Sequence, residues 1–153
     1  MRVLVFSDSH YSPDPMIACV REQKPDAVLF LGDGLRDLAE LRREFPALDI
    51  RSVRGNCDFG YEEDEVLTPV FGGVRIFMTH GHRYHVKYTL EPLANAAHFS
   101  QAPLALFGHT HQREYQVMGD VTVFNPGAVG QGGMSGGQIT IEGGKFQCRF
   151  LDL

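Results

Sequence analysis

The chain has few cysteines and no long apolar run. Its three cysteines, Cys19, Cys57 and Cys148, are odd in number and widely spaced, which argues against a disulfide framework and favours a reducing, cytoplasmic compartment. Because they do not cluster, a structural zinc site is not expected either. No stretch approaches the roughly 20 apolar residues that a membrane span requires, so we expect no membrane partner.

Surplus positive charge is also missing. The formal net charge is −5 at pH 7, which argues against an extended nucleic-acid surface, although a bound metal could still make one site locally positive. The N-terminal segment Met1–Phe6 combines a charge with a short apolar run but lacks a small-residue cleavage site. We interpret it as a first strand and not as a signal peptide.

No low-complexity tract, repeat or linker divides the 153 residues, and this length can bury a core. We therefore expect a single domain over residues 1–153. In the first half, short apolar strands alternate with helical patterns, an order typical of parallel β-α-β units. The pattern predicts strands at 2–6, 27–31 and 50–53 and helices at 13–23 and 35–45.

The second half has a different pattern. Gly72-Gly73 lies between apolar runs at 65–70 and 74–79 and predicts a hairpin, which is followed by a helix at 90–99 and a strand at 104–107. Turns at Gly119-Asp120 and Gly143-Gly144 predict a run of antiparallel strands at 114–118, 121–124, 138–142 and 145–151. Strands that alternate with helices in the first half and hairpins in the second half indicate an α/β (α+β) fold of two packed sheets with helices outside.

Side chains that can bind metal follow five of these strands. The carboxyl ends of strands in open α/β sheets share one edge, where ligands bind, so we expect these distant residues to meet there. Glycines in four of the five endings allow sharp turns. The endings are Ser7-Asp8-Ser9-His10, Gly32-Asp33-Gly34, Gly55-Asn56-Cys57-Asp58, Thr79-His80-Gly81-His82 and Gly108-His109-Thr110-His111.

Taken singly, each ending has an ordinary structural explanation. Asp-x-His is often a helix N-cap beside a surface histidine, Gly-Asp and Gly-Asn are common turns, and a lone His-x-His pair is more often part of a loop than a ligand pair. Together the endings contain five of the seven histidines, all except His85 and His98. Five such endings in one chain are hard to explain by chance.

The donor types indicate a pair of divalent metal ions. Asp, Asn and His form a mixed oxygen and nitrogen set that suits Mn, Fe, Zn, Ni or Co better than calcium. Seven donors are enough for two ions ~3.5–4 Å apart if one carboxylate bridges them. The expected ligands are Asp8, His10, Asp33, Asn56, His80, His109 and His111.

A charge count then indicates the substrate class. Two divalent ions, two aspartates and a bridging hydroxide leave a charge of about +1 in the cleft of an otherwise acidic protein. Such a cleft would attract a small-molecule phosphate ester and stabilise the charge that develops during its cleavage. The count leaves both diesters and monoesters open.

In this order, the motifs Asp-x-His, Gly-Asp, Gly-Asn-x-Asp, His-Gly-His and Gly-His-Thr-His resemble those of the calcineurin-like metallophosphoesterase superfamily. Within it the chain is most similar to the small single-domain bacterial and archaeal phosphodiesterases, over nearly its whole length and including Asn125-Pro126-Gly127. The resemblance implies a four-layer αββα sandwich of two mixed sheets flanked by helices. It also implies a dinuclear metal centre, for which Mn is our first candidate.

Carried over residue by residue, the resemblance implies two sets of ligands that share one carboxylate. A bridging water, ionised by the two cations, would attack the phosphorus in line with the leaving alcohol, without a covalent enzyme intermediate. The implied sets are Asp8, His10 and His111 for one ion, Asn56, His80 and His109 for the other, and Asp33 for both.

One position departs from the wider superfamily. Many members have Gly-Asn-His-Asp or Gly-Asn-His-Glu, where the histidine stabilises the transition state or protonates the leaving group. Cys57 stands there instead, as is common in the small phosphodiesterase branch, and it either contacts the second ion or is an inert small residue. His82 is our candidate for the acid, with a hydrogen bond to a loop carbonyl as the alternative. Asn56 and Asp58 complete the residues that we assign to catalysis; Asp58 would orient a ligand histidine or cap a turn.

These residues predict a metal-dependent phosphodiesterase. The alternatives are a phosphomonoesterase or nucleotidase that uses the same site, and a non-catalytic scaffold of the kind represented by a eukaryotic retromer subunit. All seven ligand positions keep suitable donors, which disfavours the scaffold. A homo-oligomer stays open because an exposed sheet edge can pair. Substrate specificity is expected in a rim formed by residues 12–16, 59–64, 83–87 and 130–137.

Overall fold

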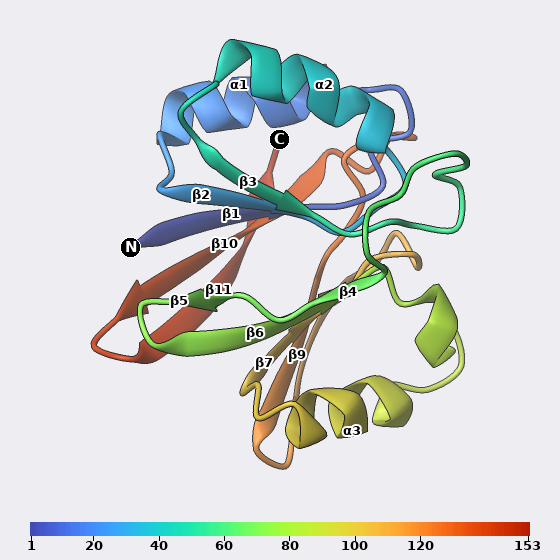
Figure 1. The fold of residues 1–153 in the computed structure, drawn as a ribbon, viewed down its shortest axis with the longest axis vertical. Coiled ribbons are helices and arrows are strands. Elements are labelled where there is room, and N and C mark those ends of the chain that lie inside the picture. The colour runs from blue at the N-terminus through green and yellow to red at the C-terminus, as the bar shows by residue number, and fades with distance from the viewer.

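Two β-sheets pack face to face, and helices cover both outer faces (Figure 1), in the computed structural model, which describes all residues 1–153. Helices α1 (Asp14–Gln23) and α2 (Leu35–Glu44) lie against the first sheet, and α3 (Glu91–Phe99) lies against the second. The predicted α/β class and the four-layer αββα arrangement are confirmed. No helix is long and apolar enough to cross a membrane.

The first sheet contains five strands, which in chain order are β1 (Arg2–Phe6), β2 (Ala27–Phe30), β3 (Asp49–Ser52), β10 (Ser135–Glu142) and β11 (Lys145–Asp152). Their order across the sheet is β11-β10-β1-β2-β3. β1, β2 and β3 are parallel, with α1 and α2 as the connections between them. Their carboxyl ends therefore lie at one edge of this sheet.

The second sheet contains six strands, β4 (Val66–Leu67), β5 (Val70–Phe71), β6 (Val74–Thr79), β7 (Leu104–Leu106), β8 (Arg113–Met118) and β9 (Val121–Pro126). Its order is β4-β6-β7-β9-β8, and β5 also pairs with β6. β6, β7 and β9 are parallel. Their carboxyl ends face the same side of the molecule as those of β1 and β2, since the Gly108 N–H donates to the His80 carbonyl and the His109 N–H to the Asp8 carboxylate.

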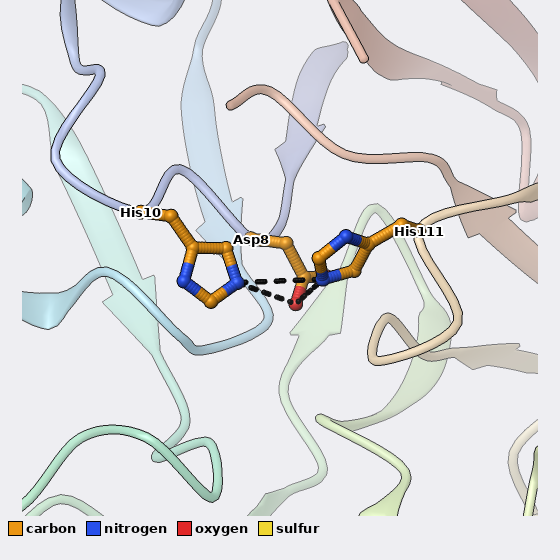
Figure 2. Close-up of side chains that lie close together, drawn as sticks. All are labelled: Asp8, His10 and His111. Atoms are coloured by element: carbon orange, nitrogen blue, oxygen red, sulfur yellow. Dashed lines mark hydrogen bonds and ion pairs between the residues drawn. The ribbon is translucent and has the colours of Figure 1, made fainter. Parts of the chain in front are cut away.

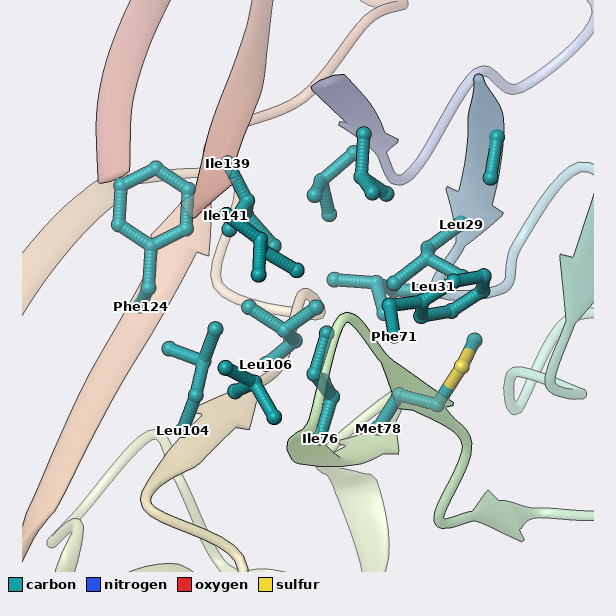
Figure 3. Close-up of a cluster of buried hydrophobic side chains, with 14 of the residues drawn as sticks. Leu29, Leu31, Phe71, Ile76, Met78, Leu104, Leu106, Phe124, Ile139 and Ile141 are labelled. Atoms are coloured by element: carbon teal, nitrogen blue, oxygen red, sulfur yellow. The ribbon is translucent and has the colours of Figure 1, made fainter. Parts of the chain in front are cut away.

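The main hydrophobic core lies between the two sheets (Figure 3). Its 15 buried residues come from both sheets and include Leu29, Ile76, Leu104 and Ile139. A second cluster packs α1 and α2 on the first sheet, and a third packs α3 on the second. The inter-sheet cluster is what fixes the strand ends of one sheet against those of the other.

The prediction of one antiparallel run in the C-terminal part is wrong. β8 and β9 form a hairpin in the second sheet, whereas β10 and β11 form a hairpin in the first. Between them the chain crosses from one sheet to the other, and the N–H of Val129 donates to the carbonyl of Ser7 at 3.0 Å. Alternation of apolar and polar residues predicts which face of a strand is buried, but it does not say which strand is its neighbour.

Two smaller predictions also need correction. The expected strand at 65–70 is divided into β4 and β5, because Pro69 has no N–H to donate; its carbonyl accepts a hydrogen bond from Ile76 at 2.8 Å. The glycine-rich segment 130–137 belongs only partly to a rim, since Ser135, Gly136 and Gly137 are buried in β10. A Cβ atom at Gly137 would lie 2.6 Å from the ring of Phe124, so this glycine serves packing.

Candidate metal centre

The carboxyl ends of β1, β2, β6 and β7 bring six of the seven expected ligands into two groups of three. Each group combines one carboxylate with two imidazoles, and the donor atoms within a group lie within 4.8 Å of one another. The groups are Asp8, His10 and His111, and Asp33, His80 and His109. This grouping matches the division between two ions that the resemblance implied.

The first group joins the end of β1 to the loop after β7 (Figure 2). The Nε2 atom of His111 lies 3.1 Å from Oδ1 of Asp8, and Nε2 of His10 lies 3.7 Å from the same oxygen. The two imidazole Nε2 atoms are 3.3 Å apart. Three donor atoms thus converge on one point, although His10 and His111 are separated by 101 positions in the sequence.

The second group is the more deeply buried. His80 is fully buried, and its Nε2 lies 3.2 Å from Oδ2 of Asp33. Its Nδ1 lies 2.7 Å from the carbonyl of Leu31. Because a carbonyl only accepts hydrogen bonds, Nδ1 carries the proton, and the lone pair of Nε2 is left free to bind a metal ion. The His109 ring lies beside it, with 5.1 Å between ring centroids.

The two groups adjoin through their carboxylates. Oδ2 of Asp33 lies 3.9 Å from His10 Nε2 in the other group, and Oδ1 of Asp8 lies 3.8 Å from His80 Nε2. Oδ1 of Asp8 and Nε2 of His80 are buried and have no hydrogen-bond partner. Such orphaned atoms are rare in folded proteins because burial without a partner is costly. Two adjoining sets of oxygen and nitrogen donors with orphaned buried atoms fit a pair of transition-metal ions.

The pKa values describe carboxylates that attract positive charge. Burial opposes ionisation of Asp8 and Asp33, but the nearby imidazoles of His111 and His80 lower the pKa of both carboxyls below the usual value. The nearby Asp8 carboxylate raises the pKa of His111, although burial opposes it. For His80, burial also opposes the charged form, yet Asp33 and Asp8 raise its pKa. Burial and the charge on His80 lower the pKa of His109 to about 4.

Backbone strain is concentrated at the same residues. Asp8, His10, Asp33, His109 and His111 all have positive φ angles, between 42° and 69°. Non-glycine residues adopt this region infrequently, at a cost of about 1–3 kcal/mol each, and such residues cluster at functional sites. The fold therefore holds these five side chains in their places against a local preference.

The loops that carry the ligands are packed too closely for any side chain at two glycines. A Cβ atom at Gly108 would overlap Oγ of Ser7, and one at Gly55 would overlap Oδ1 of Asp33. These glycines let the loops of different strands approach one another closely enough for the donors to converge.

Asp58 lies behind the centre and binds backbone. Its carboxylate accepts hydrogen bonds from the N–H groups of Asp33, Gly34, Leu35 and Gly55, at 2.7 to 3.0 Å. It makes no hydrogen bond to a histidine. Of the two roles expected for Asp58, the structure places it in the turn-capping role, in which it joins the Asp33 turn, the start of α2 and the Gly55 turn.

Asn56, Cys57 and His82 lie at the edge of the centre. Asn56 is exposed, and its side chain donates to Sγ of Cys57 at 3.5 Å; the Cys57 N–H donates to Oδ1 of Asp33 at 2.8 Å. Asn56 and His82 line one hollow of 540 Å³ together with Glu65. The ring of His82 lies 5.5 Å from that of His80, and its Nδ1 is buried without the predicted alternative bond to a loop carbonyl.

Two supporting residues were not predicted from the sequence. Asp37, in α2, accepts hydrogen bonds from Ser9 Oγ and the Tyr11 N–H and so fixes the loop that carries His10. Asn125, at the end of β9, donates to the Gly108 carbonyl and to Thr110 Oγ1, both at 3.0 Å. The family resemblance includes Asn125 in the Asn125-Pro126-Gly127 motif without giving it a role. Its position after an apolar strand is the signal that could have identified it.

Known proteins share the sequence pattern and the fold of this chain. The profile of the calcineurin-like phosphoesterase superfamily domain matches residues 1–141. A probable metallophosphoesterase of Bacillus subtilis, YsnB, is 33% identical over 132 residues, which cover 84% of this chain and 75% of that protein.

Solved structures with the same fold include a predicted phosphoesterase from Streptococcus pneumoniae, which is 29% identical, has a TM-score of 0.83 and matches 99% of this chain and 88% of its own. Wild-type Vps29 from Entamoeba histolytica, solved with zinc, has a TM-score of 0.79 over 99% of both chains; at 21% identity this likeness shows the fold alone.

Proposed function

The chain belongs to the calcineurin-like phosphoesterase superfamily, and from this membership we propose that it is a metal-dependent phosphodiesterase with a dinuclear centre. The observation that carries the proposal is the pair of adjoining donor groups, which leave Asp8 Oδ1 and His80 Nε2 buried without partners. The membership of a phosphoesterase family and the two donor groups that could each hold a cation both support metal-dependent hydrolysis of phosphate esters.

Asp8, His10 and His111 would hold one ion, His80 and His109 would hold the other, and Asp33 would contribute to both. Two bound dications, with Mn as the expected metal, would supply the charge that attracts the phosphate and lowers the pKa of the attacking water. The exposed Asn56, in the same hollow as His82, is the residue that would complete the second ligand set.

The charges around the centre suit an anionic phosphate ester. Arg54 and Arg83 both form ion pairs with Glu65, at 2.9 and 3.0 Å. One carboxylate offsets only one of the two guanidinium charges, so positive charge remains beside the hollow that Asn56 and His82 line. This charge suits a diester monoanion and a monoester dianion alike, so the choice of a diester rests on the resemblance to the small phosphodiesterases and is decided by turnover.

His82 is our candidate for protonating the leaving alcohol. It stands two residues after the ligand His80, and its side chain is 17% exposed, so it can reach a bound ester. Burial and the charge on His80 lower its pKa, which opposes the acid role, while Glu65, 3.8 Å from Nε2, offsets part of that effect. The developing negative charge on a leaving oxygen would favour the protonated ring further.

A non-catalytic scaffold is the second candidate, because Vps29 shares the fold and has been solved with zinc. Metal binding alone therefore does not distinguish an enzyme from a scaffold, whereas turnover of a phosphate ester does.

The test is hydrolysis of bis-p-nitrophenyl phosphate by metal-depleted protein with and without added Mn, beside the monoester p-nitrophenyl phosphate. We expect Mn-dependent turnover, a higher kcat/KM for the diester, and loss of both activities in Asp33→Asn. Equal rates for wild type and Asp33→Asn would contradict the proposal, and metal binding without turnover would favour the scaffold. A higher kcat/KM for the monoester would assign the site to a phosphomonoesterase.

A further inference from the structure

A narrow cleft beside the metal centre carries exposed aromatic side chains that the proposed chemistry does not use. The cleft has a volume of 190 Å³ and extends from His10 and Asp33 to Tyr11, Phe59 and Arg36. Tyr11 is 76% exposed and Phe59 is 85% exposed. Aromatic side chains of this size usually bury much of their surface, and here two of them stand at the entrance to one site.

The backbone holds both aromatic residues at fixed positions relative to the centre. Tyr11 directly follows His10, has a φ of 67°, and donates its N–H to the buried carboxylate of Asp37 at 3.1 Å. Phe59 directly follows Asp58, whose carboxylate is bound by four backbone N–H groups. The side chains are in solvent, but the loops that present them are anchored.

Arg36 adds a cation to the same cleft. Its guanidinium carbon lies 5.3 Å from the centroid of the Tyr11 ring, and it forms no ion pair with a carboxylate. This differs from Arg54 and Arg83, which share the carboxylate of Glu65. The cleft therefore offers two aromatic rings and one guanidinium plane with free N–H donors.

We propose that this cleft binds a nucleobase, so that the substrate of the metal centre is a nucleoside ester of phosphate. The proposal rests on the phosphodiesterase function above and names its substrate class. A planar base stacks on aromatic rings and on guanidinium planes, and its edge accepts hydrogen bonds from arginine. An aliphatic ester group would use neither property. Because His10 and Asp33 line the inner end of the cleft, a base bound there leaves its phosphate at the metal centre.

The test compares two monophosphates that differ only in the base, adenosine 5′-monophosphate and ribose 5-phosphate, by calorimetric titration of the Mn-loaded protein. We expect the wild-type protein to bind the nucleotide about ten-fold more tightly, which is the usual effect of stacking one base. If either ester is turned over, the ratio of kcat/KM values replaces the ratio of Kd values.

Phe59→Ala and Tyr11→Ala should each reduce this preference toward unity and leave the affinity for ribose 5-phosphate unchanged. Phe59→Leu should reduce it as well, because leucine is apolar but not planar. The matched control is Phe99→Ala, which removes a phenylalanine of nearly equal exposure, 83%, at the end of α3, and should keep the full preference.

Equal affinity of wild-type protein for the two monophosphates would overturn the proposal, as would a preference that survives in both Phe59→Ala and Tyr11→Ala. Turnover of bis-p-nitrophenyl phosphate is measured on the same preparations. Absence of a base preference in the wild-type protein, together with normal turnover, refutes only the nucleobase cleft, whereas absence of turnover refutes the phosphodiesterase function.

Discussion

At the scale of single residues, Asp33 is the side chain on which both donor groups depend. Its Oδ2 lies 3.2 Å from His80 and 3.9 Å from His10. Asp33→Asn keeps the shape of the side chain but removes its charge, so we expect the content of both metal ions to fall. Activity should fall by more than the ~10- to 100-fold that is typical of changing a residue hydrogen-bonded to a metal ligand. Elemental analysis and diester hydrolysis measure this. Asp120→Asn, an exposed change, is the control. Full metal content and full rate in Asp33→Asn would show that it bridges nothing.

His82 is expected to act on the reaction without holding metal. His82→Gln should lower kcat about 10²- to 10⁴-fold, the usual contribution of a general acid, while metal content stays normal. The matched control is His85→Gln, which changes an exposed histidine three residues further along the chain. Parallel loss of metal and rate would instead make His82 a ligand, and an unchanged rate would leave the leaving-group acid to be found elsewhere.

The histidines also predict a pH dependence of metal binding. Asp8 and Asp33 raise the pKa of His111 and His80, so these imidazoles keep the charged form to a higher pH than a free histidine does, and the extra proton must leave before a metal binds. We expect Mn affinity to rise between about pH 6 and pH 8. Calorimetry in two buffers of different ionisation enthalpy measures the proton release. Affinity that is independent of pH, without proton release, would contradict the ligand assignment of both histidines.

At the scale of elements, the junction between α2 and the loop after β3 depends on Asp58. Its four backbone hydrogen bonds replace the side-chain cap that α2 otherwise lacks. Asp58→Asn brings an amide N–H toward backbone donors, so we expect the free energy of unfolding to fall by about 2–4 kcal/mol. Asp49→Asn, at an exposed ion pair with Arg51, should cost less than about 1 kcal/mol. Chemical denaturation measures the free energy of unfolding of both variants. Equal losses would show that the four hydrogen bonds of Asp58 do not stabilise this junction.

Most elements could be predicted from sequence, because their cause is local. Apolar runs that end at polar residues or glycine predict β1, β2, β6 and β7 to within one residue. The assignment of β9 and β10 to different sheets could not be predicted, since hairpin signals at Gly119 and Gly143 describe each pair and not its place. The division at Pro69 does have a local signal, because proline lacks the N–H that an unbroken strand would donate.

The donor residues were predictable for a similar reason, because each follows an apolar strand. Their division into two groups came from the family resemblance, and the structure places six of the seven, all except Asn56, in two matching groups. What sequence could not give is the role of Asp58 or the exposure of Asn56, since both depend on how loops from different strands approach one another. The aromatic cleft likewise joins Tyr11 to Phe59 across 48 positions.

At the scale of the whole molecule, the centre straddles two sheets. Asp8 and Asp33 follow strands of the first sheet, whereas His80, His109 and His111 follow strands of the second. The inter-sheet core holds these edges together, with side chains such as Leu29 and Leu104 fully buried. The site therefore exists only when both sheets have packed, which couples metal binding to the stability of the entire fold.

The most direct test of the account is an anomalous difference map from crystals of the wild-type protein grown with Mn. The account predicts two peaks ~3.5–4 Å apart, one in contact with Asp8, His10 and His111, the other in contact with His80 and His109, and Asp33 between them. A map with no peak at these residues, or with a single ion bound by other side chains, would contradict it.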